Sequence, residues 1–563
     1  MKSTKTILME EIKGHPLKTV ALLLVIMTII LLSLLPPQIL RMIIDTKLTP
    51  KVSKGLLLLS VSYLAAILVG ALFDFLKTAL LISFGQNIVR NLRSAMEEKL
   101  ERLPLSFFTT HSPGSVTSRF SNDAEQVNTL FSNGLINLVI DLSKVFGIII
   151  SIAIFSWKLA VITLLVVPLI ALFTRVFRRT IYQAQKKNLD QISKVNGHIA
   201  ETLSGIHMVK AYAREKYMED RYKKQLASNF KTLDNVNRFD AIYAPLISII
   251  KGALITVVVV LSSDSIGMLG ISLGAVAASV ELITNLFQPI DAFGMEIEKI
   301  QRGRSGIAGV DGFLSQTEET PKDKTITMEQ LFPNGKTELR FSHLSYRYPD
   351  GEEDVLSDLD FPITQGSHVA FTGRTGVGKT TLFRLVLGLI KPTTGRLTLG
   401  NKDVHLIPND LKRKIFGSVE QQFIPVEGTL LDQISLHDET ITQEACRNAL
   451  RFVGLDNLEP IGDEPFRDDL FSQGEKQLLS IARAIVTDPP ILLFDEITAA
   501  LDAKTEERLS TVLKAASKDR TLLSISHRES SIRECDTVIR IEKGRIIGIG
   551  NPDEMLRKTY SYS

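Results

Sequence analysis

The fold of the C-terminal part of the chain is decided by the stretch Gly373-Arg374-Thr375-Gly376-Val377-Gly378-Lys379-Thr380-Thr381. It follows Ser367–Thr372, a run typical of a buried strand, and precedes apolar residues at helical spacing from Leu382 onward. A G-x-x-x-x-G-K-T pattern between a strand and a helix is typical of a phosphate-binding loop, because glycines let backbone N–H groups converge on phosphate oxygens. The following helix N-terminus adds a favourable dipole. We therefore expect Lys379 to reach the terminal phosphates of a nucleotide and Thr380 to bind Mg²⁺.

A second stretch with site chemistry reads Pro-Ile-Leu-Leu-Phe-Asp-Glu from Pro490 to Glu496. Its four apolar residues predict a buried parallel strand, and its acidic pair follows at the carboxyl end of that strand. Ligands of open parallel sheets bind at this edge. We expect Asp495 to bind Mg²⁺ through water and Glu496 to orient or deprotonate an attacking water.

The N-terminal part of the chain is dominated by long apolar runs, although 45% of all residues are hydrophobic and 23% are charged. A membrane-spanning helix needs about 20 mostly apolar residues. Six stretches qualify: Val20–Leu40, Leu56–Leu81, Leu135–Phe155, Leu159–Val176, Ala241–Leu261 and Ile266–Phe287. No small-residue cleavage site follows the first run, so we expect it to be retained as a span.

Charge predicts how these spans are oriented. The two long connections between spans are helical in character and carry basic residues near the membrane, among them Arg90, Arg93, Arg178 and Lys186. Such loops are expected in the cytoplasm, which puts both termini there, although Lys47 and its basic neighbours in the first outside loop disagree. The net charge of +3 gives no electrostatic reason to expect nucleic acid as a partner. Six spans also exclude a soluble kinase or GTPase.

Ionisable residues lie inside the apolar runs at six positions: Asp74, Lys77, Asp141, Lys144, Lys251 and Glu281. Charges at membrane depth usually face a bundle interior or a wet cavity. Two sets have opposite charges three residues apart, so they are candidates either for pairing along one helix face or for lining a substrate cavity. Lys251 and Glu281 have no such local partner and are the better cavity candidates.

Together these features resemble the ATP-binding cassette (ABC) exporters, specifically half-transporters with the type IV, domain-swapped membrane fold, over about residues 15–558. The resemblance implies an all-α transmembrane domain of six helices, followed by an α/β P-loop nucleotide-binding domain with a helical subdomain. We expect the transmembrane domain at 1–314, a linker at 315–337 and the nucleotide-binding domain at 338–563. Segments 106–123 and 201–215 resemble the family's two cytoplasmic coupling loops.

The resemblance also implies roles for further site residues. Tyr348 matches the aromatic residue that stacks on adenine, and Gln421 matches the glutamine that touches Mg²⁺ and the membrane domain, with Gln422 as an off-by-one alternative. Asp502 matches the loop that crosses to the partner. His527 matches the switch histidine that contacts the γ-phosphate. The implied cofactors are ATP and Mg²⁺, with Thr380, Gln421 and Asp495 as metal ligands.

One motif departs from the family pattern. The signature loop, normally Leu-Ser-Gly-Gly-Gln, here reads Phe471-Ser472-Gln473-Gly474-Glu475 and keeps only Ser472 and Gly474. Gln473 replaces a glycine that permits close backbone approach, and Glu475 adds negative charge beside a phosphate. Both changes are expected to weaken transition-state stabilisation. Phe466 also stands where the family usually has a glutamate that contacts the coupling loops.

An intact catalytic set beside a poor signature predicts a heterodimer, since a homodimer would carry the defect in both composite sites. The competent site would combine Lys379, Asp495, Glu496 and His527 with the signature of a different ABC half-transporter. The other site, containing Ser472, would bind ATP and hydrolyse it slowly or not at all.

The sequence therefore predicts an ATPase-coupled exporter of the cytoplasmic membrane, with its nucleotide-binding domain in the cytosol. A drug, a lipid and a peptide all remain open as substrates. A nucleotide-gated channel, a regulatory ABC subunit and a homodimeric exporter are the alternatives. The complete pair of Glu496 and His527 argues against a gated channel, since gating needs nucleotide binding more than turnover.

Overall fold

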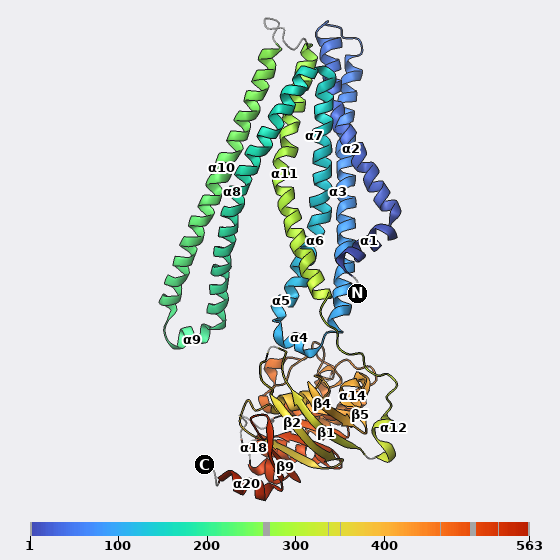
Figure 1. Cartoon of the computed structure of the whole chain (residues 1–563), viewed down its shortest axis with the longest axis vertical. Helices are drawn as coiled ribbons and strands as arrows, with labels where there is room; N and C mark the ends of the chain where they lie inside the picture. The colour runs from blue at the N-terminus through green and yellow to red at the C-terminus, as the bar shows by residue number, and fades with distance from the viewer. Residues whose placement is uncertain are drawn as a thin grey trace. The chain divides into compact units, whose positions relative to one another are not determined.

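A computed structural model describes residues 3–262, 271–335, 337–349, 351–461, 463–495, 503–526 and 529–560. The chain folds into two compact units (Figure 1). The first contains Met1–Glu101 and Pro113–Gln316, and the second contains Arg102–Ser112 and Thr317–Ser563. The segment Arg102–Ser112 lies between the two parts of the first unit in sequence but belongs to the second unit. It includes α4 (Leu105–Thr110).

The first unit is a bundle of long helices. Within the described residues, six helices are long and apolar enough to cross a membrane, which confirms the predicted number of spans. They are α2 with η1 (Pro16–Leu48), α3 (Leu56–Leu100), the run of α5, η2, α6, η3 and α7 (Pro113–Phe155), α8 (Trp157–Ser204), α10 (Glu215–Leu261) and α11 (Leu273–Leu314). A short helix, α1 (Thr4–Gly14), precedes the first span.

Helices α8 and α10 form a long hairpin joined by α9 (Ile206–Ala211) (Figure 1). They are 48 and 47 residues long. At about 1.5 Å per residue each spans roughly 70 Å, about twice the thickness of a bilayer core. The second long connection is therefore mainly helical, as predicted, because α8 and α10 each extend from the membrane into it and α9 joins their ends. Ser156 is the N-cap of α8, and its hydroxyl accepts a hydrogen bond from the Leu159 N–H at 3.5 Å.

The core of the first unit is built on one face of α11. Leu282, Ile283, Leu286 and Phe287 are buried there against apolar side chains of α7, α8 and α10. Since apolar side chains recur at a spacing of three and four residues, they form a continuous stripe along the helix. That stripe fixes which way α11 faces.

A polar junction joins three helices of this bundle. The Asp291 carboxylate of α11 accepts hydrogen bonds from the Arg178 guanidinium of α8 at 2.8 Å and from the Tyr243 hydroxyl of α10 at 2.6 Å. Arg178 also lies over the Tyr243 ring, with 4.9 Å between its guanidinium carbon and the ring centroid. A Cβ atom at Gly294 would lie 3.0 Å from the Arg178 side chain, so the glycine leaves room for that stem.

Two of the ionisable residues predicted inside the spans are paired. Lys77 donates a hydrogen bond to Asp74 at 2.6 Å, as expected from their spacing on α3. Asp141 of α7 interacts electrostatically with Lys144, and also with Lys77, Lys299 and Glu296. The helix-face pairing interpretation therefore accounts for Asp74 and Lys77.

The second unit holds two sheets within the described residues. One has the order β2-β1-β4-β5 and is antiparallel; the other has the order β10-β9-β3-β8-β7-β6, parallel except for the antiparallel edge strand β10. The strands are β1 (Glu338–Tyr346), β2 (Leu356–Thr364), β3 (His368–Thr372), β4 (Thr394–Leu399), β5 (Lys402–Asp403), β6 (Phe416–Val419), β7 (Ile491–Asp495), β8 (Thr521–Ile525), β9 (Thr537–Glu542) and β10 (Arg545–Gly550). This α/β domain after six membrane helices confirms the predicted fold class.

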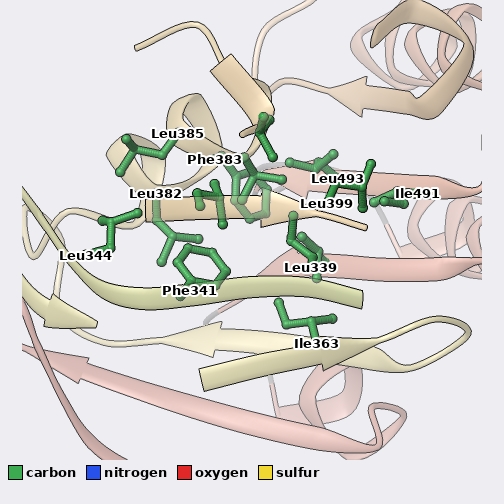
Figure 2. Close-up of a cluster of buried hydrophobic side chains, with 14 of the residues drawn as sticks. Leu339, Phe341, Leu344, Ile363, Leu382, Phe383, Leu385, Leu399, Ile491 and Leu493 are labelled. Carbon is green, nitrogen blue, oxygen red and sulfur yellow. The ribbon is translucent and has the colours of Figure 1, made fainter. Parts of the chain in front are cut away.

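Helix α13 (Lys379–Val386) is packed between residues of both sheets. Figure 2 shows Leu382 and Phe383 of this helix gathered with Phe341 of β1 and Leu493 of β7. All four are buried. Ile326 belongs to the same core, although it falls in the polar stretch expected to be a linker. A helix anchored in this way holds the phosphate-binding loop at its N-terminus in a fixed position.

A second core lies among the helices of this unit. It joins α16 (Gln443–Phe452) and α17 (Gln473–Ile485) to β7 through buried residues such as Leu450, Leu478 and Leu492. The remaining helices are α12 (Met328–Leu331), α14 (Asn409–Ile415), α15 (Asp432–Ser435), α18 (Ala503–Ser517), α19 (Glu529–Arg533) and α20 (Pro552–Tyr560).

Candidate nucleotide site

The loop before α13 has a backbone that requires glycine. Gly373 has φ +153° and Gly378 has φ +100°, values that side chains rarely adopt. A Cβ atom at Gly373 would lie 2.3 Å from the carbonyl oxygen of Ile541, and one at Gly378 would lie 2.8 Å from the Leu356 side chain. The loop is therefore pressed against β9 and the start of β2, while Arg374, Thr375 and Gly376 are exposed at its tip.

Lys379 is folded back into this loop. Its ammonium group donates hydrogen bonds to the carbonyl oxygens of Gly373 at 2.7 Å and Arg374 at 3.1 Å. The residue is buried, with 6% of its surface exposed. A buried ammonium group next to an exposed, glycine-rich turn at the start of a helix is an arrangement that attracts phosphate oxygens.

Thr380 and Asp495 meet although 115 positions separate them along the chain. The Thr380 hydroxyl donates to the Asp495 carboxylate at 3.4 Å. Asp495 is the last residue of β7, and β3, which precedes the loop, is separated from β7 only by β8. A hydroxyl and a carboxylate at this edge are oxygen ligands of the kind that Mg²⁺ prefers, so the donor set fits the predicted metal.

Tyr348 is held beside the first turn of α13. Its hydroxyl lies 3.0 Å from the Thr381 hydroxyl and accepts a hydrogen bond from Arg384 at 3.3 Å. The ring of Tyr346 packs edge-on against it, with 5.0 Å between centroids. The aromatic residue predicted to meet adenine therefore lies next to the phosphate-binding helix.

Gln421 follows β6 on an exposed segment. Its backbone carbonyl accepts a hydrogen bond at 2.8 Å from the side chain of Gln477, a buried residue of α17. This contact ties the segment containing Gln421 and Gln422 to the helix that begins at the signature loop. Sequence reasoning missed Gln477; its sequence signal is a polar residue on the mainly apolar buried face of α17.

The altered signature loop caps α17. The Ser472 hydroxyl and the Ser472 N–H both donate to the same Glu475 carboxylate oxygen, at 2.8 and 2.9 Å. The Glu475 N–H donates in return to the Ser472 hydroxyl at 3.3 Å. This is a capping box, in which the N-cap and third residues of a helix satisfy one another. Both donors of the signature serine are therefore engaged by a negatively charged group.

Phe466 lies in an aromatic cluster just before the signature loop. Its ring stacks on that of Phe471 with 4.9 Å between centroids and lies 5.9 Å from that of Phe423. Arg483 of α17 lies over the Phe423 ring at 4.5 Å. Where a glutamate is expected, this chain thus has an apolar side chain that packs against the signature loop itself.

Three predicted site residues, Glu496, Asp502 and His527, lie outside the described residues. The strands that lead to Glu496 and His527 are neighbours in the sheet, and Asp495 pairs with Ile525 across them. Asp495, which directly precedes Glu496, and Ile525, which lies two positions before His527, are therefore adjacent.

Comparisons with known proteins agree with this architecture. Residues 19–290 match the ABC transporter transmembrane region family, and residues 356–499 match the ABC transporter family. The chain belongs to the ABC transporters. Among solved structures, a bacterial Atm1-family ABC exporter with ATP bound superposes with a TM-score of 0.77 at 23% identity, over 97% of this chain and 96% of that one. This likeness establishes that the fold is that of an ABC exporter.

Several curated relatives are similar over most of their length. The chain is 28% identical to a probable multidrug resistance ABC transporter ATP-binding/permease protein of Bacillus subtilis, covering 89% of this chain and 75% of the relative. It is 28% identical to an ATP-dependent lipid A-core flippase of Albidiferax ferrireducens, over 94% and 91%. A fatty acid ABC transporter ATP-binding/permease protein of Mycobacterium bovis is also 28% identical, over 89% and 79%.

This ABC exporter is thus an ATPase-coupled transporter of the cytoplasmic membrane. Its six spans lie in the bilayer and its nucleotide-binding domain lies in the cytosol.

Proposed function

We propose that this ABC exporter works as one subunit of a heterodimer, with one competent and one degenerate ATP site. The observation that carries the proposal is the engagement of both Ser472 donors by the Glu475 carboxylate. A signature serine stabilises a phosphate by donating hydrogen bonds to it. A carboxylate that accepts these hydrogen bonds instead competes with the phosphate for the donors and also repels it. Two such signatures in a homodimer would impair both sites.

The competent site would use this chain's phosphate-binding loop and the signature of a different subunit. Backbone N–H groups of residues 373–379 would bind the phosphates, with Lys379 exchanging its carbonyl acceptors for phosphate oxygens. Tyr348 would stack on the adenine. Thr380, Asp495 and Gln421 would hold Mg²⁺, which when bound neutralises charge on the phosphates.

Hydrolysis at that site would depend on the acidic residue after β7. Glu496 would orient and deprotonate the attacking water, and His527 would contact the γ-phosphate. Binding of ATP between the two nucleotide-binding domains, followed by its hydrolysis, would drive the membrane helices between inward-open and outward-open states. Asp502 would lie in the loop that meets the partner subunit.

The names of the relatives support export of an amphiphilic compound, since one is named for multidrug resistance and others for lipid A-core and fatty acid. A drug, a lipid or a peptide is therefore the class of substrate proposed. The polar junction between Arg178, Tyr243 and Asp291 would keep α8, α10 and α11 moving together.

The test uses the full-length chain, purified in detergent both with any subunit that co-purifies and alone. We expect two different subunits in equal amounts, and an ATPase activity that Glu496→Gln lowers by at least about a hundredfold. Glu507→Gln, on the exposed face of α18, is the matched control and should leave the activity unchanged.

Two outcomes would contradict different parts of the proposal. Vigorous ATPase activity and transport by the chain purified with copies of itself alone would exclude the heterodimer and leave a homodimeric exporter. An activity insensitive to Glu496→Gln would instead exclude the hydrolytic mechanism and favour the gated-channel or regulatory alternative.

A further inference from the structure

The face of α11 opposite the bundle core carries a stripe of polar residues at membrane depth. Thr284, Asn285 and Gln288 are exposed, whereas the intervening Leu282, Ile283, Leu286 and Phe287 are buried. Glu281 begins the stripe, and the four polar residues follow the spacing i, i+3, i+4 and i+7 of one helix face. We call Glu281, Thr284, Asn285 and Gln288 the α11 polar stripe.

This stripe lies within the thickness of a bilayer. At about 1.5 Å per residue, Glu281 is roughly 12 Å and Gln288 roughly 22 Å along the helix from Leu273, where α11 begins, and a bilayer core is about 30 Å thick. A charged side chain facing lipid at that depth costs about 3 kcal/mol. The stripe must therefore face water, a substrate or another helix rather than acyl chains.

Glu281 differs from the other acids of the spans in its surroundings. Asp74 pairs with Lys77 at 2.6 Å, and Glu296 pairs with Lys299 at 2.9 Å. In the part of the chain that the structure describes, Glu281 takes part in no ion pair, and its buried Oε2 atom has no hydrogen-bond partner. Helix α3 packs against α11, and Tyr63 of α3 lies close enough to interact electrostatically with Glu281.

The amides beside it are also available. Thr284 donates to the Val280 carbonyl of its own helix at 2.8 Å, but among the described residues neither Asn285 nor Gln288 has a side-chain hydrogen bond. One uncompensated carboxylate with two free amides, on a segment of α11 whose other face is apolar, is complementary to an amphiphile with an apolar body and a cationic group. An anionic lipid headgroup would be repelled by the Glu281 carboxylate.

We propose that the α11 polar stripe is the specificity surface of the transport pathway, and that Glu281 binds the positive charge of a cationic amphiphilic substrate. This inference rests on the proposed export function and narrows its substrate class. Glu281 is the substrate-binding residue of this proposal, and Tyr63 of the adjacent helix α3 is its neighbour.

The experiment measures ATPase stimulation of the purified full-length assembly in proteoliposomes by two probes. Tetraphenylphosphonium is a permanent cation, and triphenylphosphine oxide is a neutral compound with a similar aromatic body. We expect Glu281→Gln to raise the half-saturating concentration of the cation at least about tenfold. The neutral probe should be unaffected, and Glu281→Asp should keep the cation within about threefold of wild type.

Asp74→Asn is the matched control, because it removes the same charge from a span where that charge is paired within its own helix. It should leave the half-saturating concentration of the cation unchanged. Should Glu281→Gln fail to fold, E281C tests the same idea, since Cys446 and Cys535 are buried with 1% and 8% of their surface exposed. Tetraphenylphosphonium should slow its reaction with a water-soluble cationic thiol reagent.

Each contrary result has one meaning. Equal shifts for both probes in Glu281→Gln would indicate a contact between helices or subunits and overturn the inference, as would no shift for either probe. A wild-type assembly that responds to the neutral probe or to lipid but not to the cation would also overturn it, while leaving export intact. Loss of the proposed function would appear instead as ATPase activity insensitive to Glu496→Gln.

Discussion

Replacing Glu475 by glutamine isolates the charge that the signature loop has acquired. Glutamine also forms capping boxes at the third helical position, so the Glu475→Gln variant should keep the start of α17 intact. What changes is the acceptor of the two Ser472 hydrogen bonds at 2.8 and 2.9 Å, from a carboxylate to a neutral amide oxygen. The serine donors then become easier to redirect towards a phosphate.

The size of the effect follows from those two bonds. Hydrogen bonds to charged groups contribute about 1.5–3 kcal/mol, and neutral ones about 0.5–1.5 kcal/mol. The difference is about 1 kcal/mol for each bond and about 2 kcal/mol for both. Since about 1.4 kcal/mol is tenfold in an equilibrium constant, we expect ATP to bind roughly 10- to 30-fold more tightly at the site containing Ser472.

The assay measures ATP retained by the purified assembly when hydrolysis at the competent site is blocked by Glu496→Gln. With Glu475→Gln added, the second site should fill at a roughly 10- to 30-fold lower ATP concentration. Glu475→Ala is the control: it removes the side-chain half of the capping box as well as the charge, while the Ser472 hydroxyl can still accept from the backbone N–H of residue 475, so the melting temperature should fall. An unchanged filling concentration in Glu475→Gln would refute the reasoning that the carboxylate weakens this signature.

Three further outcomes follow from the structure. Gly373→Ala should abolish ATP binding, measured by nucleotide titration, because its Cβ atom would lie 2.3 Å from the Ile541 carbonyl oxygen. Gly376→Ala meets no atom within 4 Å and is strained only by its φ of +86°, so it should bind ATP more weakly than wild type but better than Gly373→Ala. Burial, and then the nearby charge of Lys322, lower the pKa of Lys412 to about 7 in the folded chain. Above that pH the unfolded chain binds more protons than the folded chain, so the free energy of unfolding rises with pH. Lys412→Met should remove a slope of up to about 1.4 kcal/mol per pH unit between about pH 7 and 10, measured as melting temperature against pH. Asp291→Asn should destabilise the helix bundle by about 1–3 kcal/mol, because two hydrogen bonds to its carboxylate weaken, and differential scanning of the full-length chain would detect this.

Features set by local sequence were predicted well. The six spans and the strand before the phosphate-binding loop follow from apolar runs, and the loop's conformation follows from its glycines. The bounds of β3 and β7 were predicted to within about a residue, because strands buried on both faces have continuous apolar sequences. These elements depend on residues that are neighbours in the chain.

Features set by distant contacts were not predicted. The ion pair between Arg178 and Asp291 joins residues 113 positions apart, and no periodicity encodes it. Glu281 was identified as an unpaired charge, but the stripe that it begins becomes visible only when Leu282 and its neighbours are known to face the core. For the same reason the bond from Gln477 to the backbone of Gln421 could not be predicted.

The signature loop shows how one residue can favour the start of a helix and, in the function proposed here, weaken a nucleotide site. Glu475 is a good residue for the start of a helix, because it completes a capping box and places negative charge at the positive end of the helix dipole. The same two properties make it a poor neighbour for a phosphate, since they occupy the donors and supply the wrong charge. Folding alone therefore favours glutamate at this position, whereas nucleotide binding would favour a residue without its charge. In the heterodimer that we propose, a different chain supplies the working signature, so we expect the partner's signature loop to lack this carboxylate.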